Sequence, residues 1–130
     1  RLTYAEAEQM FKRMVFNVIA RNCDDHTKNF SFLMNAEGIW KLAPAYDVCF
    51  AYRPDSKWVS QHNLSINGKR KDFTRKDLLT IAEQNSIRNP EGVINSCIEV
   101  VTNWKMYAEM YQVDEKKTHA IDQLLLKELK

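Results

Sequence analysis

A dense polar segment, residues 22–29, interrupts the hydrophobic pattern of this 130-residue chain. Before it, large apolar residues recur at spacings of three and four between positions 10 and 19, which predicts one face of a helix. After it, Phe30, Phe32 and Met34 occupy every second position, as apolar residues do on one face of a strand. A polar loop held between a core helix and a hairpin can be rigid, which is how functional sites are usually built.

Short motifs set the limits of these elements. Thr3 followed by Glu6 is a capping box, so the first helix is predicted from about Tyr4 to Arg21. The residues after the polar segment predict a short hairpin, with a turn at residues 35–38 and a second strand at residues 39–42.

The rest of the chain is predicted to be irregular to about residue 71, apart from a strand-like stretch at 64–66, and helical thereafter. Thr74, Asn89 (followed by Pro90) and Asp114 are the expected N-caps. The helix from Asn89 should carry one apolar stripe: Ile94, Cys97, Ile98, Val101, Trp104, Ala108 and Tyr111. The last helix should contain Ile121, Leu124 and Leu125. The predicted fold class is mainly α with a small β-hairpin, in a single domain spanning residues 1–130.

Composition excludes several classes of protein. The chain is 45% hydrophobic and 28% charged, as in soluble globular proteins. It has no apolar run near the roughly 20 residues of a membrane span, and no signal-peptide pattern in its first residues. A net charge of +2, with one basic cluster at residues 69–76, does not predict direct nucleic-acid binding. Three widely spaced cysteines without a CxxC motif argue against disulfides and zinc, and favour a reducing cytoplasm.

Three polar residues stand at spacings that suit phosphoryl transfer. That reaction needs a carboxylate to take the hydroxyl proton and oxygen ligands that hold Mg²⁺. Asp24 and Asn29 have the D-x-x-x-x-N spacing of a kinase catalytic loop, and Asp47 follows the hairpin, where a second metal ligand is expected. Any one of these residues alone is better explained as a turn former, and the combination favours a site.

The wider pattern resembles the HipA family of toxin kinases. It consists of Asn22-x-Asp24-x-His26-x-Lys28-Asn29-Phe30 and, downstream, Pro44-x-Tyr46-Asp47. Its D-x-H-x-x-N core is also similar to the catalytic loop of lipid-kinase-related phosphotransferases. The resemblance covers nearly the whole chain. It implies the helical C-terminal lobe of a HipA-like, kinase-like fold, in a serine/threonine kinase that transfers the γ-phosphate of ATP to a protein hydroxyl.

The resemblance also assigns roles to individual residues. Asp24 would be the catalytic base, while Asn29 and Asp47 would hold Mg²⁺ and, through it, the ATP phosphates. His26 and Lys28 would shape the loop or neutralise charge, although His26 could equally be a loop-packing hydrogen bonder. Asp25 departs from the family pattern, where this position is usually small and neutral. We expect Asp24 to be the base, because only Asp24 has the right spacing to Asn29.

Downstream, Trp58, His62 and Asn63 are candidates for substrate or partner contact. The chain opens on Arg1 rather than Met, and it has neither a glycine-rich phosphate loop nor a strand lysine. We therefore expect the nucleotide-clamping N-terminal lobe to be absent, and the chain alone to be inactive. The family implies a protein substrate, such as a translation component, and a HipB-like DNA-binding antitoxin.

Two other functions compete with the kinase interpretation. One is a non-catalytic docking domain for the antitoxin, which would have no reason to keep Asp24, Asn29 and Asp47 together. The other is a metal-dependent nuclease built on Asp25-His26 with His62-Asn63, which lacks the ββα context of such sites.

Overall fold

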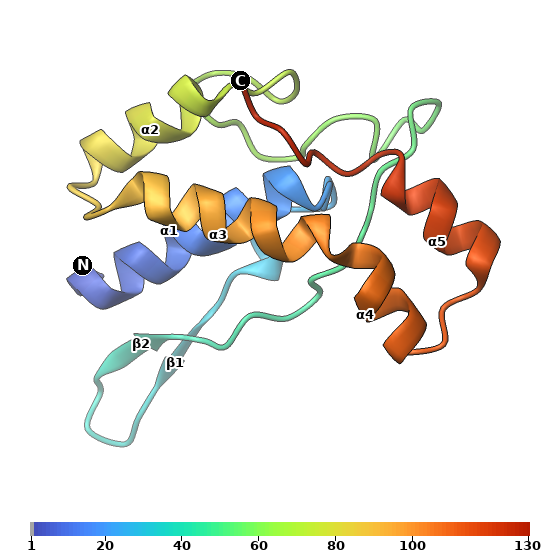
Figure 1. Ribbon diagram of the computed structural model, residues 1–130. Helices are drawn as coiled ribbons and strands as arrows, with labels where there is room; N and C mark the ends of the chain where they lie inside the picture. The colour runs from blue at the N-terminus through green and yellow to red at the C-terminus, as the bar shows by residue number, and fades with distance from the viewer. Residues whose placement is uncertain (1) are drawn as a thin grey trace.

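Two helices packed side by side, α1 (Tyr4–Ile19) and α3 (Pro90–Thr102), form the centre of the fold (Figure 1). The computed structural model describes residues 2–130. Within them, a 3₁₀ turn η1 (Thr27–Asn29) precedes the antiparallel strands β1 (Phe32–Met34) and β2 (Trp40–Leu42). The remaining helices are α2 (Arg75–Gln84), α4 (Trp104–Met110) and α5 (Glu115–Asp122). The prediction of a mainly α fold with one small hairpin is confirmed.

The capping box of α1 also attaches the hairpin to the helix. Thr3 Oγ1 accepts from the Glu6 amide, and the Glu6 carboxylate accepts from the Thr3 amide at 2.8 Å. The other carboxylate oxygen of Glu6 accepts from the backbone amide of Leu42, also at 2.8 Å. These bonds from Thr3 and Leu42 lower the pKa of Glu6. One side chain therefore starts the helix and fixes the position of β2.

The first helix ends two residues earlier than predicted. Arg21 has a left-handed backbone (φ 57°), and the Asn22 amide bonds back to the carbonyl of Asn17 at 2.8 Å. This is the Schellman pattern that closes many helices, here without the usual glycine. The chain therefore changes direction at the end of α1, where the polar segment begins.

The core lies among α1, α2, α3 and the C-terminal segment. Its most completely buried side chains are Val15, Val18, Ile19, Leu78 and Ile94. After α5, the chain returns to the start of α2 (Figure 1), where Arg75 N donates to the Lys130 carbonyl at 2.7 Å. On the way, the amide of Leu126 donates to the carbonyl of Ile19. The C-terminal segment is therefore tied both to the end of α1 and to the start of α2.

The helix predicted to run through Tyr111 is broken at Asn103. Thr102 Oγ1 donates to the Ile98 carbonyl at 2.7 Å, and Asn103 Nδ2 donates to the Glu99 carbonyl at 3.1 Å. Such bonds from side chains to the backbone compete with helical hydrogen bonding. Tyr111 ends up 77% exposed, so its assignment to the apolar stripe was wrong.

Two other local predictions were also wrong. Leu124 and Leu125 lie beyond the end of α5. The stretch at residues 64–66 makes a single bridge, Ile66 to Lys69, around the Asn67-Gly68 turn rather than a strand.

No helix within residues 2–130 combines the length and the hydrophobicity that a membrane span requires.

The Asn67-Gly68 turn is fastened to α2 by the buried carboxylate of Asp77. Asp77 is the N3 residue of a capping box with Thr74, and the structure confirms Thr74 as the N-cap. Its carboxylate also accepts from Lys69 Nζ at 2.8 Å and from Asn67 Nδ2 at 2.9 Å. The bond from Lys69, and then those from Thr74 and Asn67, hold the pKa of Asp77 well below its ordinary value of 3.8.

Loss of this carboxylate should destabilise the fold in a pH-dependent way. Because the pKa of Asp77 is lower in the folded than in the unfolded chain, its ionised carboxylate stabilises the fold fully at pH values above the unfolded-state pKa near 3.8. This stabilisation is lost progressively as the pH falls from there toward the folded-state pKa. We expect Asp77→Ala to lower the free energy of unfolding by about 2 kcal/mol at pH 7. The loss should shrink in acid. Urea denaturation at pH 7 and pH 3 measures both values, with exposed Asp55→Ala as a control that changes little. A loss that is equal at the two pH values would contradict this account.

Candidate active site

The polar segment is paired with the chain that follows the hairpin. Cys23 N donates to the Ala51 carbonyl and Ala51 N donates to the Arg21 carbonyl, each at 3.0 Å. Asn22 is buried, and its Nδ2 donates to Asn17 Oδ1 at 3.1 Å. Burial raises the pKa of the Cys23 thiol to about 11, so this cysteine is not a ready nucleophile.

Asn29 and Asp47 are in direct contact. Asn29 Nδ2 donates to Asp47 Oδ2 at 2.9 Å and to the carbonyl of Asp24, also at 2.9 Å. Asp47 is exposed and has a left-handed backbone (φ 52°). Its carbonyl lies 3.4 Å from Nδ2 of the buried Asn22. The structure thus brings Asn29 and Asp47 together, 18 residues apart in sequence, beside the backbone of Asp24.

The two carboxylate oxygens of Asp24 lie in different environments, because only Oδ1 is close to other side chains. Its side chain is 46% exposed. Oδ1 lies 3.4 Å from Asn63 Nδ2 and 3.9 Å from His26 Nε2. Within residues 2–130, no protein group donates to Oδ2. That oxygen can therefore accept a proton from a hydroxyl that approaches the loop.

His26 and Lys28 contribute in different ways. His26 Nδ1 is buried and has no hydrogen-bond partner within residues 2–130, while Nε2 faces the Asp24 carboxylate. The side chain of Lys28 is exposed, and its carbonyl accepts from Tyr46 Oη at 2.7 Å. Tyr46 belongs to the second motif, so this bond links the two motifs a second time.

Asp25, which had no role in the kinase interpretation, makes the most hydrogen bonds of the carboxylates in the segment. It is buried, and its Oδ2 lies 2.9 Å from Nδ1 of the buried His62. Its Oδ1 accepts from the backbone amides of Asn63 at 2.8 Å and Leu64 at 3.3 Å. The His62 ring packs edge-on against Phe73, with the ring centroids 5.2 Å apart. No local pattern could reveal this pairing, because the partners lie 37 to 39 residues downstream.

The burial of Asp25 and His62 argues against the nuclease interpretation. Within residues 2–130, no group of three or more His, Cys, Asp or Glu residues could hold a metal ion. Magnesium in a kinase does not need such a group, because one or two carboxylates, substrate phosphates and water complete its shell. The exposed carboxylate of Asp47 beside the amide of Asn29 fits that requirement.

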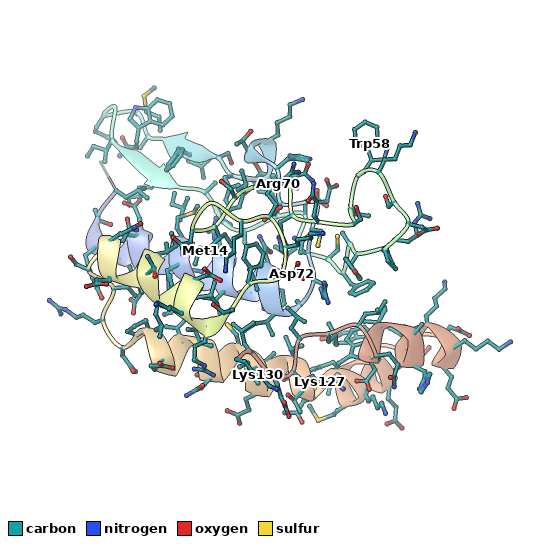
Figure 2. The ribbon with its side chains drawn as sticks, turned by 90° about the horizontal axis from the view of Figure 1, so that it is seen from above. Met14, Trp58, Arg70, Asp72, Lys127 and Lys130 are labelled. Atoms are coloured by element: carbon teal, nitrogen blue, oxygen red, sulfur yellow. The ribbon has the colours of Figure 1, made fainter. Side chains whose placement is uncertain are left out.

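The remaining downstream candidates lie in different environments. Trp58 is 78% exposed and points away from the helices at the outer end of its loop (Figure 2). Ser56 Oγ accepts from the amides of Trp58 and Val59, which keeps this loop in shape. His62 is buried, so direct contact with a substrate, as the sequence suggested, is excluded by the fold. Asn63 is half-buried and contacts Asp24.

A cavity of about 740 Å³ opens beside Asn29 and Asp47 and extends between α1 and α3. Its walls combine apolar side chains with two cations from α1 and with Arg88, which lies just before α3. They include Lys12, Arg13, Phe16, Arg88, Val93 and Val100. The candidate metal-binding pair thus lies at the edge of a cavity large enough for a small-molecule ligand.

The sequence model of the HipA-like C-terminal domain family matches residues 1–108. The chain belongs to this family. HipA-like proteins are generally related to kinases and to toxin–antitoxin systems, which agrees with the resemblance seen in the two motifs. No curated protein matched the chain.

Asp24 and Asp25 should differ sharply in their effect on stability. Asp25→Ala leaves a buried histidine and two backbone amides without their acceptor, and should cost about 3 kcal/mol of unfolding free energy. Asp24→Ala removes a half-exposed side chain and should cost less than about 1 kcal/mol. Guanidinium denaturation of the two variants measures both. Equal losses would show that Asp25 does not anchor the segment.

Proposed function

We propose that this chain carries the catalytic loop of an ATP-dependent serine/threonine kinase. The observation that carries the proposal is the 2.9 Å contact between Asn29 Nδ2 and Asp47 Oδ2, beside the backbone of Asp24, whose carboxylate is half-exposed. A base and two oxygen ligands on adjoining segments are the parts that a C-terminal kinase lobe supplies. Membership of the HipA-like family supports the same interpretation.

In the proposed reaction, Asp24 Oδ2 accepts the proton of a serine or threonine hydroxyl as the hydroxyl oxygen attacks the γ-phosphorus of ATP. The bond from that phosphorus to the β,γ-bridging oxygen breaks, and ADP leaves. Asp47 and the amide oxygen of Asn29 would hold magnesium, which would neutralise charge on the phosphates. Lys28, exposed beside Asn29, can approach the negatively charged phosphoryl group. His26 Nε2, 3.9 Å from Asp24 Oδ1, limits the orientations of the base.

The nucleotide-clamping lobe of this kinase would lie upstream, and the isolated chain would transfer no phosphate. The hairpin supports the proposal of a further lobe. It projects from the helices (Figure 1), and its large apolar side chains are 46–60% exposed. They are Phe32, Leu33, Met34, Ile39 and Trp40. Exposed apolar patches of this kind mark interaction surfaces. In this proposal, residues 1–130 form a single domain of the longer kinase.

The partners and the compartment follow from the family. We propose a protein substrate, such as a translation component, and a HipB-like DNA-binding antitoxin that restrains the kinase in the cytoplasm. Docking of that antitoxin without catalysis is the alternative. It does not explain why Asn29 and Asp47 meet at the edge of one cavity, with Asn29 bonded to the backbone of Asp24.

Substitution of the base tests the proposal in the full-length protein. Asp24→Asn keeps the shape of the side chain but cannot take the hydroxyl proton. Transfer of radiolabelled phosphate from ATP should therefore fall by about 10²- to 10⁴-fold, with the fold intact. Asp114→Asn is the matched control, because asparagine caps a helix as well as aspartate does. Wild-type transfer by Asp24→Asn would exclude Asp24 as the base.

A further inference from the structure

Asn63 places its amide group against the loop of the proposed base. Nδ2 donates to the Cys23 carbonyl at 2.9 Å and approaches Asp24 Oδ1 at 3.4 Å. A side-chain amide has two N–H donors, so one nitrogen can serve both acceptors. Asn63 thus contacts the backbone before Asp24 and one oxygen of the Asp24 carboxylate.

The position of Asn63 is itself fixed by buried contacts. Its backbone amide donates to Asp25 Oδ1 at 2.8 Å, and its own carboxyl-terminal neighbour, Leu64, donates to the same oxygen. Asn63 N also lies 3.2 Å from the Cys23 carbonyl. On the other side, His62 is held by Asp25 Oδ2 and by its backbone bonds with Arg70. The amide group of Asn63 is therefore presented to Asp24 from a rigid support.

We propose that Asn63 is a positioning residue for Asp24 in the kinase reaction. This inference rests on the proposed function of Asp24. The amide of Asn63 and the ring of His26 both lie on the Oδ1 side of the carboxylate, at 3.4 and 3.9 Å. Oδ1 is thereby engaged, and Oδ2 is left to meet the substrate hydroxyl. Without the amide, the half-exposed carboxylate of Asp24 can rotate away from the productive orientation.

This role separates Asn63 from residues that only stabilise the same region. Asn67 is a matched comparison, since its Nδ2 also donates to an aspartate, Asp77, at 2.9 Å. That carboxylate fastens the turn to α2 and has no contact with Asp24. A purely structural role for Asn63 would give the two asparagines the same phenotype, namely lower stability with an unchanged turnover of folded protein.

Kinetics of the full-length protein test the inference, under conditions where each variant is folded by circular dichroism. Asn63→Ala should lower kcat for phosphate transfer by about 10-fold, which is the lower end of the effect of losing a hydrogen-bond partner that orients a functional group. KM for Mg-ATP should stay within twofold of wild type. Asn67→Ala should keep kcat within twofold of wild type while lowering Tm. In an Asp24→Asn background, Asn63→Ala should have less than a twofold further effect.

Three outcomes separate the possibilities. If kcat of Asn63→Ala stays within twofold of wild type, or if Asn67→Ala loses as much, Asn63 does not position the base. If Asp24→Asn retains wild-type transfer, the proposed function itself fails. If Asn63→Ala does not fold, Asn63→Ser takes its place, because serine has only one donor for the two acceptors. The same twofold limit on kcat then decides the result.

Discussion

The buried carboxylate of Asp25 joins the polar segment at residues 22–29 to a part of the chain 37 to 39 residues downstream of Asp25. It accepts from two backbone amides and pairs with the His62 ring, and the side chains of Asp25 and His62 are both buried. A buried carboxylate without partners would be costly, so the loop and residues 62–64 must come together for the fold to form. Asp24, its neighbour, is thereby held at the surface with its side chain half-exposed. Adjacent aspartates thus have opposite environments, one suited to anchoring and one to chemistry.

The hairpin brings the second motif back to the first. Asn29 precedes β1 and Asp47 follows β2, and antiparallel pairing returns the chain to its starting point. Contacts between the motifs then close the site, through Asn29 with Asp47, Tyr46 with Lys28, and Asn22 with the Asp47 backbone. Outside the site, Glu6 fixes β2 against α1. The geometry proposed for magnesium therefore depends on several separate hydrogen bonds rather than on one flexible loop.

Features encoded by neighbouring residues could be predicted from the sequence, whereas those set by distant partners could not. The capping residues Thr3, Thr74, Asn89 and Asp114 act within three residues, and all four cap as predicted. The break at Asn103 was missed because apolar spacing continues across it, while the deciding bonds come from polar side chains. The contact of Asn29 with Asp47 agrees with their motif spacing. The anchoring role of Asp25 could not be foreseen, since a lone sequence does not indicate which distant residue will meet a carboxylate.

The central claim is that Asn29 and Asp47 hold the metal while Asp24 faces the acceptor hydroxyl. The most direct test is a crystal structure of the full-length protein with Mg²⁺ and a non-hydrolysable ATP analogue. We expect one magnesium ion bound at about 2.1 Å by the Asp47 carboxylate and the Asn29 amide oxygen, with the analogue's phosphates completing its shell. The Asp25–His62 contact should be unchanged in that complex. Magnesium bound away from both residues, with Asn29 and Asp47 still paired only to each other, would contradict the account.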